Sequence, residues 1–393
     1  MKRYCTNGLC AALIWMAIAV GGTVYGQTVT RQAAMQLEQQ GKNAEAEQAW
    51  RSIAKANPRN AEAFAHIGLL EARQEHYDAA ISSYRKALSL NPAFPSLQLN
   101  LGLALFKTGK FQEAIQSFQA ELKKHPGDSR LTILLGMSHY AMGDYVGAIP
   151  YLKTAVQKDS KNLSLQLTLA HSCLWTRQST CVMDAYKQIL LIDENSAEAD
   201  MLAAEALDQQ GDNAGATRLF RDAVKANPKE PNVHFGLGYL LWTQSLFPEA
   251  AKEFSAELEN DPTRGQARAY LGDSYLQLNE YSKAMTELEK AVLVEPSMSL
   301  VHLDLGILYA EAKRNDEAER ELLKAIELDP KSVAPHWRLA KLYQTMGKKD
   351  QAKAEFAKAA SMNKEASQEL HEKIAGAAAK PGSQQPQTPP ASQ

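Results

Sequence analysis

A Gly-Asp-Ser run at residues 272–274 is one place in this 393-residue sequence where side chains could do chemistry. A hydrolase serine would sit on a sharp turn between a strand and a helix, where its hydroxyl could attack a carbonyl carbon. The run instead lies inside a stretch with helical spacing. The sequence also has no phosphate-binding loop and no helical pair of zinc-binding histidines. We therefore expect no catalytic residue, no cofactor and no enzyme activity.

Three of the nine histidines are separated by multiples of 34 residues, namely His234, His302 and His336. Imidazole nitrogens are common metal ligands, so such recurrence could indicate a metal site. Each histidine, however, falls at the same position of a helical pattern in a separate copy. We interpret the three as histidines that fill an aromatic slot, and we predict no metal.

Cys173 and Cys181 lie four residues to either side of a turn expected near Arg177. An antiparallel hairpin would place them opposite one another, and an oxidising compartment would allow a disulfide if the Cα atoms are close enough. The spacing leaves the bonded and the free state open. A bond would be structural rather than redox-active, because closing so short a loop contributes roughly 2.5 kcal/mol or less.

The elements that carry these residues recur every 34 residues, in ten copies without a gap, if the first copy begins at Gln27. Position 8 is glycine or alanine in all ten copies, and position 20 is alanine in nine. Position 24 is always large and apolar, and position 32 is proline in seven copies.

Each copy reads as two helices, because positions 4, 7, 8 and 11 and then positions 20, 24 and 27 recur at helical spacing. Between them, position 15 is glycine in five copies, which indicates a turn. Small residues at positions 8 and 20 let the two helices approach closely, and the large residue at 24 is expected to fill the space against the next copy. The proline at position 32 ends the second helix.

This spacing resembles that of the tetratricopeptide repeat (TPR) family over residues 27–366. Copy five departs from it at Ala170, Cys173, Val182 and Glu194. The resemblance implies an all-α fold, a right-handed α-solenoid of ten tandem 34-residue helix-turn-helix repeats. It also implies that the first helix of each copy lines a concave groove.

Three segments lie outside the repeats. Residues 1–26 have the form of a signal peptide, with a short apolar run after Lys2 and Arg3 and cleavage expected after Gly26; an uncleaved anchor is the alternative. Residues 367–379 are expected to form a C-terminal capping helix, and residues 380–393 a disordered Pro/Gln-rich tail. The mature protein would then be exported, periplasmic or secreted, with membrane contact only through an uncleaved signal segment.

The resemblance also implies that positions 2, 5, 6, 9, 12 and 13 of each first helix face the groove. In copies three to eight these positions hold Leu99, Leu103, Phe106, Ile133, Leu134, Met137, Tyr140, Leu167, Trp175, Met201, Leu202, Phe235, Tyr239, Trp242 and Tyr270. The seven aromatics offer on the order of 1,000 Å² of surface, more than the roughly 300–600 Å² patches of ordinary monomers. Either a partner covers this surface, or superhelix curvature or the chain's own tail hides it.

We therefore predict an exported, non-catalytic scaffold that binds protein segments in an apolar groove, with a role in assembling cell-envelope complexes. A holdase-like chaperone, a recognition subunit whose catalytic chain is separate, and self-association through the groove are alternatives. Nucleic acid is not an expected partner, because 43 Lys and Arg are balanced by 45 Asp and Glu with no basic stripe.

Overall fold

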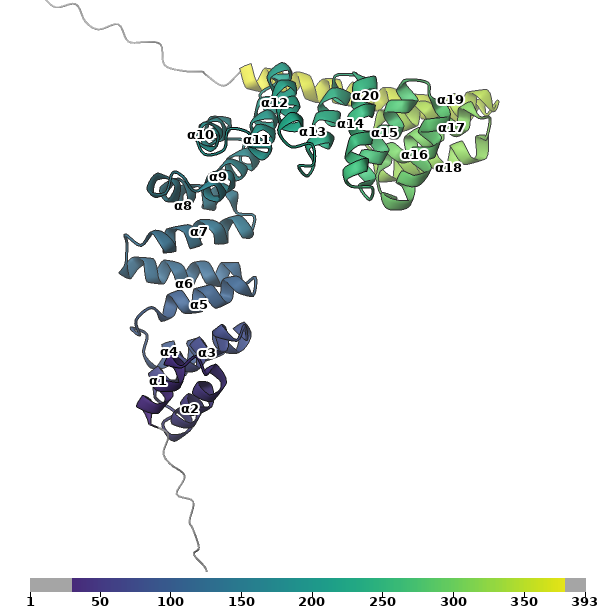
Figure 1. Cartoon of the computed structure of the whole chain (residues 1–393). Coiled ribbons are helices and arrows are strands. Elements are labelled where there is room, and N and C mark those ends of the chain that lie inside the picture. The colour runs from purple at the N-terminus through teal and green to yellow at the C-terminus, as the bar shows by residue number, and fades with distance from the viewer. Residues whose placement is uncertain (1–29, 379–393) are drawn as a thin grey trace, which may run out of the picture. The chain divides into compact units, whose positions relative to one another are not determined.

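The computed structural model describes residues 30–378, which form twenty α-helices and no strand (Figure 1). In chain order the helices are α1 (Arg31–Gln39), α2 (Asn43–Ala56), α3 (Ala61–Arg73), α4 (Tyr77–Leu90), α5 (Leu97–Lys107), α6 (Phe111–Lys124), α7 (Ser129–Ala141), α8 (Tyr145–Lys158), α9 (Leu163–Trp175), α10 (Ser179–Leu190), α11 (Ala197–Gln209), α12 (Asn213–Ala226), α13 (Val233–Thr243), α14 (Phe247–Asn260), α15 (Gly265–Gln277), α16 (Tyr281–Val294), α17 (Ser299–Glu311), α18 (Asn315–Leu328), α19 (Val333–Thr345) and α20 (Lys349–Ala378).

Two helices correspond to each 34-residue copy, so the predicted all-α repeat architecture is confirmed. The chain divides into two units, one that ends at Met142 and contains α1–α7, and one that begins at Gly143 and contains α8–α20. In the second unit the first helices of successive copies also touch one another, as α9 does α11 and α13 does α15. These odd-numbered helices therefore present one continuous face within that unit.

The turn between the two helices has the same backbone conformation in every copy. Position 15 has a positive φ in all ten, although it is glycine in only five. The other five positions hold Glu75, Arg177, Ser245, Asn279 and Lys313, with φ between 56° and 61°. This left-handed residue ends the first helix, as when the Lys110 N–H donates to the Leu105 carbonyl at 2.9 Å.

The close approach of the paired helices rests on positions 8 and 24. In copy three, a methyl group added to Gly102 would lie 2.4 Å from Cε1 of the buried Phe118 ring. In copy six, position 8 is Ala204, and the Phe220 ring lies against Gly236 of the next copy instead. The large residue at position 24 therefore packs against a glycine, which belongs to its own copy for Phe118 and to the next copy for Phe220.

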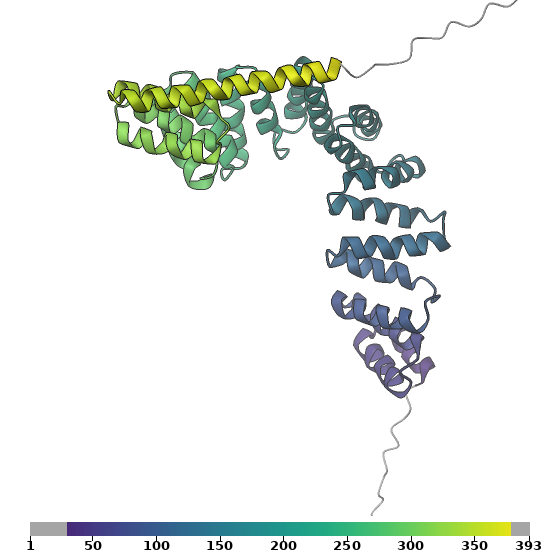
Figure 2. The same ribbon diagram turned by 180° about the vertical axis from the view of Figure 1, so that it is seen from behind.

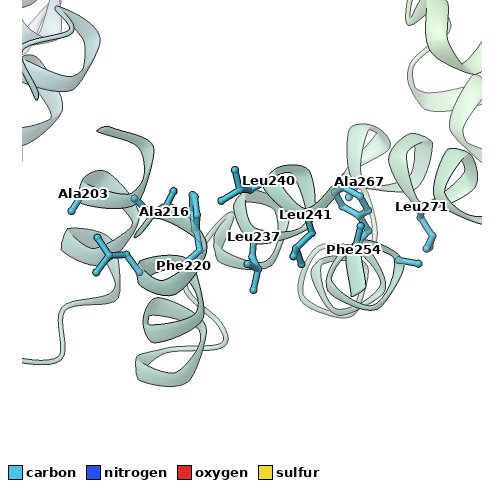
Figure 3. Packing of buried hydrophobic residues seen from close by; sticks show 13 residues of the cluster. Ala203, Ala216, Phe220, Leu237, Leu240, Leu241, Phe254, Ala267 and Leu271 are labelled. Carbon is cyan, nitrogen blue, oxygen red and sulfur yellow. The ribbon is translucent and has the colours of Figure 1, made fainter. Parts of the chain in front are cut away.

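A core of this kind runs through α11–α15 of the second unit (Figure 3). Phe220 from α12 and Phe254 from α14 point towards Leu237 and Leu241 of α13, with Leu271 of α15 at the far end. All five are buried, so α13 and α15 are held in place by close packing against α12 and α14.

The last helix continues past the repeats. α20 is one helix of 30 residues, so the boundary expected at Ala366 falls inside it. The predicted signal peptide and Pro/Gln-rich tail lie outside the described residues. Within residues 30–378, none of the helices combines the length and the apolar character that crossing a membrane requires.

Candidate functional site

The residues predicted to line the groove fall in both units. In the first unit they lie on α5 and α7, where Leu103 is 39% exposed and the others are half-buried. The half-buried members are Leu99, Phe106, Ile133, Leu134, Met137 and Tyr140. Phe106 meets the Phe111 ring edge-on, with ring centroids 5.3 Å apart. This set is apolar, and Leu103 is its most accessible member.

The second unit gathers four rings that we call the aromatic cluster: Phe235, Tyr239 and Trp242 on α13 and Tyr270 on α15. Tyr239 lies at its centre, with its ring centroid 6.3 Å from Phe235, 5.9 Å from Trp242 and 5.3 Å from Tyr270. Trp242 and Tyr270 meet edge-on at 5.0 Å. Edge-on and offset contacts at such distances stabilise aromatic pairs.

The aromatic cluster rests on the core of Figure 3. Phe235, Trp242 and Tyr270 are partly buried against it, and the Phe235 ring also meets the Phe254 ring at 5.9 Å. Tyr239 is 41% exposed. The cluster is therefore a rigid surface with one prominent ring, and ordering it on binding would cost little side-chain entropy.

Charged groups beside the aromatic cluster have partners within the protein. The Arg264 guanidinium lies 4.0 Å from the centre of the Phe235 ring and pairs with the buried Glu257 at 3.2 Å. The Trp242 indole N–H donates to the buried Asp273 at 2.5 Å. These pairings leave an apolar surface that favours an apolar ligand.

Trp175 forms a second exposed aromatic site on the same unit. Its side chain is 67% exposed at the end of α9, and its ring stacks on Tyr145 of α8 at 5.7 Å. Leu167 and Met201 are half-buried, and Met201 packs on the core. Leu202 is only 4% exposed, so its expected position in the groove is wrong; it packs inside the unit.

Cys173 and Cys181 form a disulfide in the structure, with Cα atoms 5.8 Å apart. The bond joins α9 to α10 around the turn at Arg177, and Cys173 is fully buried. Because Trp175 lies between the two cysteines in sequence, the bond also ties down the helix end that presents the Trp175 ring.

Each position-4 histidine bonds to a glutamate 19 residues later, on the second helix of the same copy. The pairs are His234–Glu253, His302–Glu321 and His336–Glu355, each with Nδ1 2.6 Å from the carboxylate, and Arg268–Glu287 repeats the arrangement in copy eight. The sequence analysis interpreted the histidines as residues that fill an aromatic slot and missed these partners. The signal was the glutamate at position 23 wherever position 4 is basic.

The Gly-Asp-Ser run at residues 272–274 lies inside α15, as expected from its helical spacing. Ser274 is fully buried in α15 and donates its hydroxyl to the Tyr270 carbonyl at 2.7 Å, as a helix-internal serine does. Among residues 30–378, no three His, Cys, Asp or Glu side chains gather in a way that could hold a metal ion.

Beside the aromatic cluster lie two buried carboxyl groups, Asp273 on α15 and Asp304 on α17. Burial, and then the negative charge of Asp273, raise the pKa of Asp304 well above its usual value, with Arg338 opposing. Asp273 also accepts hydrogen bonds from the Trp242 indole N–H and from the Gln277 side-chain amide. Burial also raises the pKa of Tyr270, whose phenol can donate a hydrogen bond.

Comparison with known proteins identifies the repeats. A tetratricopeptide repeat model matches residues 99–162, 201–264 and 271–333; a second matches 139–206 and 309–374, and a TPR repeat model matches 68–109. No curated protein matches the sequence significantly.

Several solved structures resemble the chain. MamA from Desulfovibrio magneticus RS-1 is 20% identical with a TM-score of 0.39, and the match covers 43% of this chain and 96% of that one. YrrB, a TPR protein with an unusual peptide-binding site, is 18% identical with a TM-score of 0.40 over 48% of this chain and 98% of that one. The Cut9–Hcn1 structure is 15% identical with a TM-score of 0.48, over 75% and 58%.

Proposed function

Because this chain belongs to the tetratricopeptide repeat family, we propose that it is an exported, non-catalytic scaffold that binds partner protein segments on the concave face of its first helices. TPR folds typically act as protein-interaction scaffolds. The export signal expected at residues 1–26 supports a role in the periplasm or outside the cell, in the assembly of envelope complexes.

The observation that carries this proposal is the aromatic cluster, with Tyr239 exposed at its centre. A large aromatic side chain that is held by packing on one face and exposed to solvent on the other is of the kind that contributes most to binding at protein interfaces. Trp175, stacked on Tyr145, adds a second anchor of the same kind. Two anchors on one unit suit an extended segment or a helix better than a small molecule.

Cross-linking in the native cell envelope tests the proposal. The wild type is compared with a Tyr239→Ser/Trp175→Ser variant, and bound proteins are identified by mass spectrometry. The control is Tyr281→Ser/Leu323→Ser, because Tyr281 is 44% and Leu323 47% exposed on the second helices α16 and α18. We expect a small set of partners with the wild type and the control, lost from the first variant. Recovery of the same cross-linked proteins from the wild type and both variants would refute binding at these anchors.

Export is tested separately. Cell fractionation should place the protein outside the cytoplasm, and N-terminal sequencing should show cleavage after Gly26. A cytoplasmic protein that retains Met1 would refute the exported part of the proposal and leave the binding surface intact.

A further inference from the structure

We infer that residues 379–393 of this same chain, which follow α20, are a ligand of the aromatic cluster and compete there with outside partners. This inference rests on the proposed function and names an occupant for its binding surface. The segment reads AKPGSQQPQTPPASQ.

The composition of this segment suits the cluster. It holds four prolines, with Pro386 and Pro389 in a PxxP arrangement, and Lys380 is its only charged side chain. Such segments favour the polyproline II conformation, which is recognised by grooves lined with aromatic rings. Because that conformation is largely preformed, binding loses little chain entropy.

The dimensions match as well. Prolines three residues apart lie one turn apart in polyproline II, about 9 Å along the segment. The rings of α13 extend over two centroid steps, 6.3 Å from Phe235 to Tyr239 and 5.9 Å from Tyr239 to Trp242. Pro386 and Pro389 can therefore pack to either side of the prominent Tyr239 ring.

Charge and hydrogen bonding favour the same occupant. Arg264 is paired with Glu257, and Asp273 accepts from Trp242, so the surface offers no strong charge to an acidic or basic ligand. Polyproline II leaves its backbone carbonyls free as acceptors. The Tyr270 phenol is a donor for one of them.

The direction of α20 favours contact between residues 379–393 and the aromatic cluster. From its contact with α19, the helix extends towards the side of the second unit on which α12 lies (Figures 1 and 2). Residues 367–378 extend it by about 18 Å beyond the last repeat. The 15 residues that follow reach about a further 46 Å in polyproline II. α13 lies three copies before α19.

Tethering makes a weak ligand effective. A segment joined by a short linker has an effective concentration in the millimolar range. An outside partner must displace it, so only ligands that bind more strongly than this internal competitor occupy the surface.

The test uses a fluorescein-labelled peptide of residues 379–393, titrated by anisotropy against chains beginning at Gln27 and ending at Gln393 or at Ala378. We expect the chain ending at Ala378 to bind the peptide about tenfold more tightly than the chain that keeps its own segment. A peptide with its four prolines changed to alanine should lose this binding.

Tyr239→Ser in the chain ending at Ala378 should abolish peptide binding, and the matched control Tyr281→Ser should retain it. Unchanged circular dichroism and thermal midpoint show that both variants are folded. Absence of peptide binding to the chain ending at Ala378 overturns the inference, and equal affinity of the two chain lengths overturns its intramolecular part. If the peptide does not bind but envelope partners still depend on Tyr239 and Trp175, the inference is refuted and the proposed function is supported. If binding of those partners is also independent of both residues, the proposed function is refuted too.

Discussion

Gly102 of α5 lies directly beneath the Phe118 ring of α6, and a methyl group on Gly102 would come within 2.4 Å of that ring. The same relationship joins Gly68 to Tyr84 and Gly238 to Phe254. It explains why position 8 is small throughout: the second helix lays its largest side chain across the first helix at that point.

Gly102→Ala should therefore destabilise the first unit. Alanine favours the helix by about 1 kcal/mol over glycine, but overpacking against a fully buried ring costs about 1–3 kcal/mol. We expect a lower urea midpoint. Gly127→Ala is the control, because nothing lies within 4 Å of a methyl group there. A midpoint for Gly102→Ala at or above the wild-type value would show that Phe118 can move aside.

Lys313→Gly should stabilise the second unit. Lys313 has a φ of 59°, a conformation that costs a side-chain-bearing residue about 1–2 kcal/mol and glycine almost nothing. Part of this gain is offset by the greater freedom of glycine in the unfolded chain, so we expect about 0.5–1 kcal/mol.

The control for Lys313→Gly is its neighbour, Ala312→Gly, where φ is −77° and glycine relieves no strain. Thermal melts of both variants decide the matter. A loss of stability in Lys313→Gly equal to that in Ala312→Gly would contradict the prediction.

Asp304→Asn should raise stability at neutral pH. The folded-state pKa of Asp304 lies well above its ordinary value of 3.8. The contribution of this protonated carboxyl to the stability of the folded state is therefore fully present below about pH 4. That contribution is lost as the pH rises towards and through the folded-state pKa, because unfolding then lets the carboxyl ionise. Asparagine stays neutral and can donate to Asp273.

The measurement is the difference in thermal midpoint between Asp304→Asn and the wild type from pH 4 to pH 8. We expect the difference to grow in favour of the variant as the pH rises. The control, Asp316→Asn, removes an exposed carboxylate on α18 and should show no such trend. A variant that is less stable than the wild type at pH 8 would mean that Arg338 holds Asp304 ionised.

Reduction of the Cys173–Cys181 disulfide should weaken the second unit. The cysteines are 8 residues apart, and closing so short a loop contributes roughly 2.5 kcal/mol or less. We expect dithiothreitol to lower the urea midpoint of the wild type and to leave a Cys173→Ser/Cys181→Ser variant unchanged. Equal responses of the two proteins would remove the disulfide as the cause.

Most of the fold could be predicted because the 34-residue spacing repeats local signals. α4 ends at Leu90 just before Pro92, and α5 ends where Gly109 takes its positive φ. Glu75 and Lys313 adopt the same turn without a glycine to announce it. Packing of the two helices imposes that conformation on them, so residue type alone could not reveal it.

The sequence by itself determined the helices, their pairing and the apolar character of the first-helix face, since each depends on spacing within one or two copies. Only the tertiary structure decided which of those side chains remain accessible. Tyr239 is open and Leu202 buried, although both lie on first helices. It also paired His234 with Glu253 and set Asp304 against Asp273. The physical reason is that exposure and pKa depend on neighbours supplied by other helices, in the same copy or in adjacent ones.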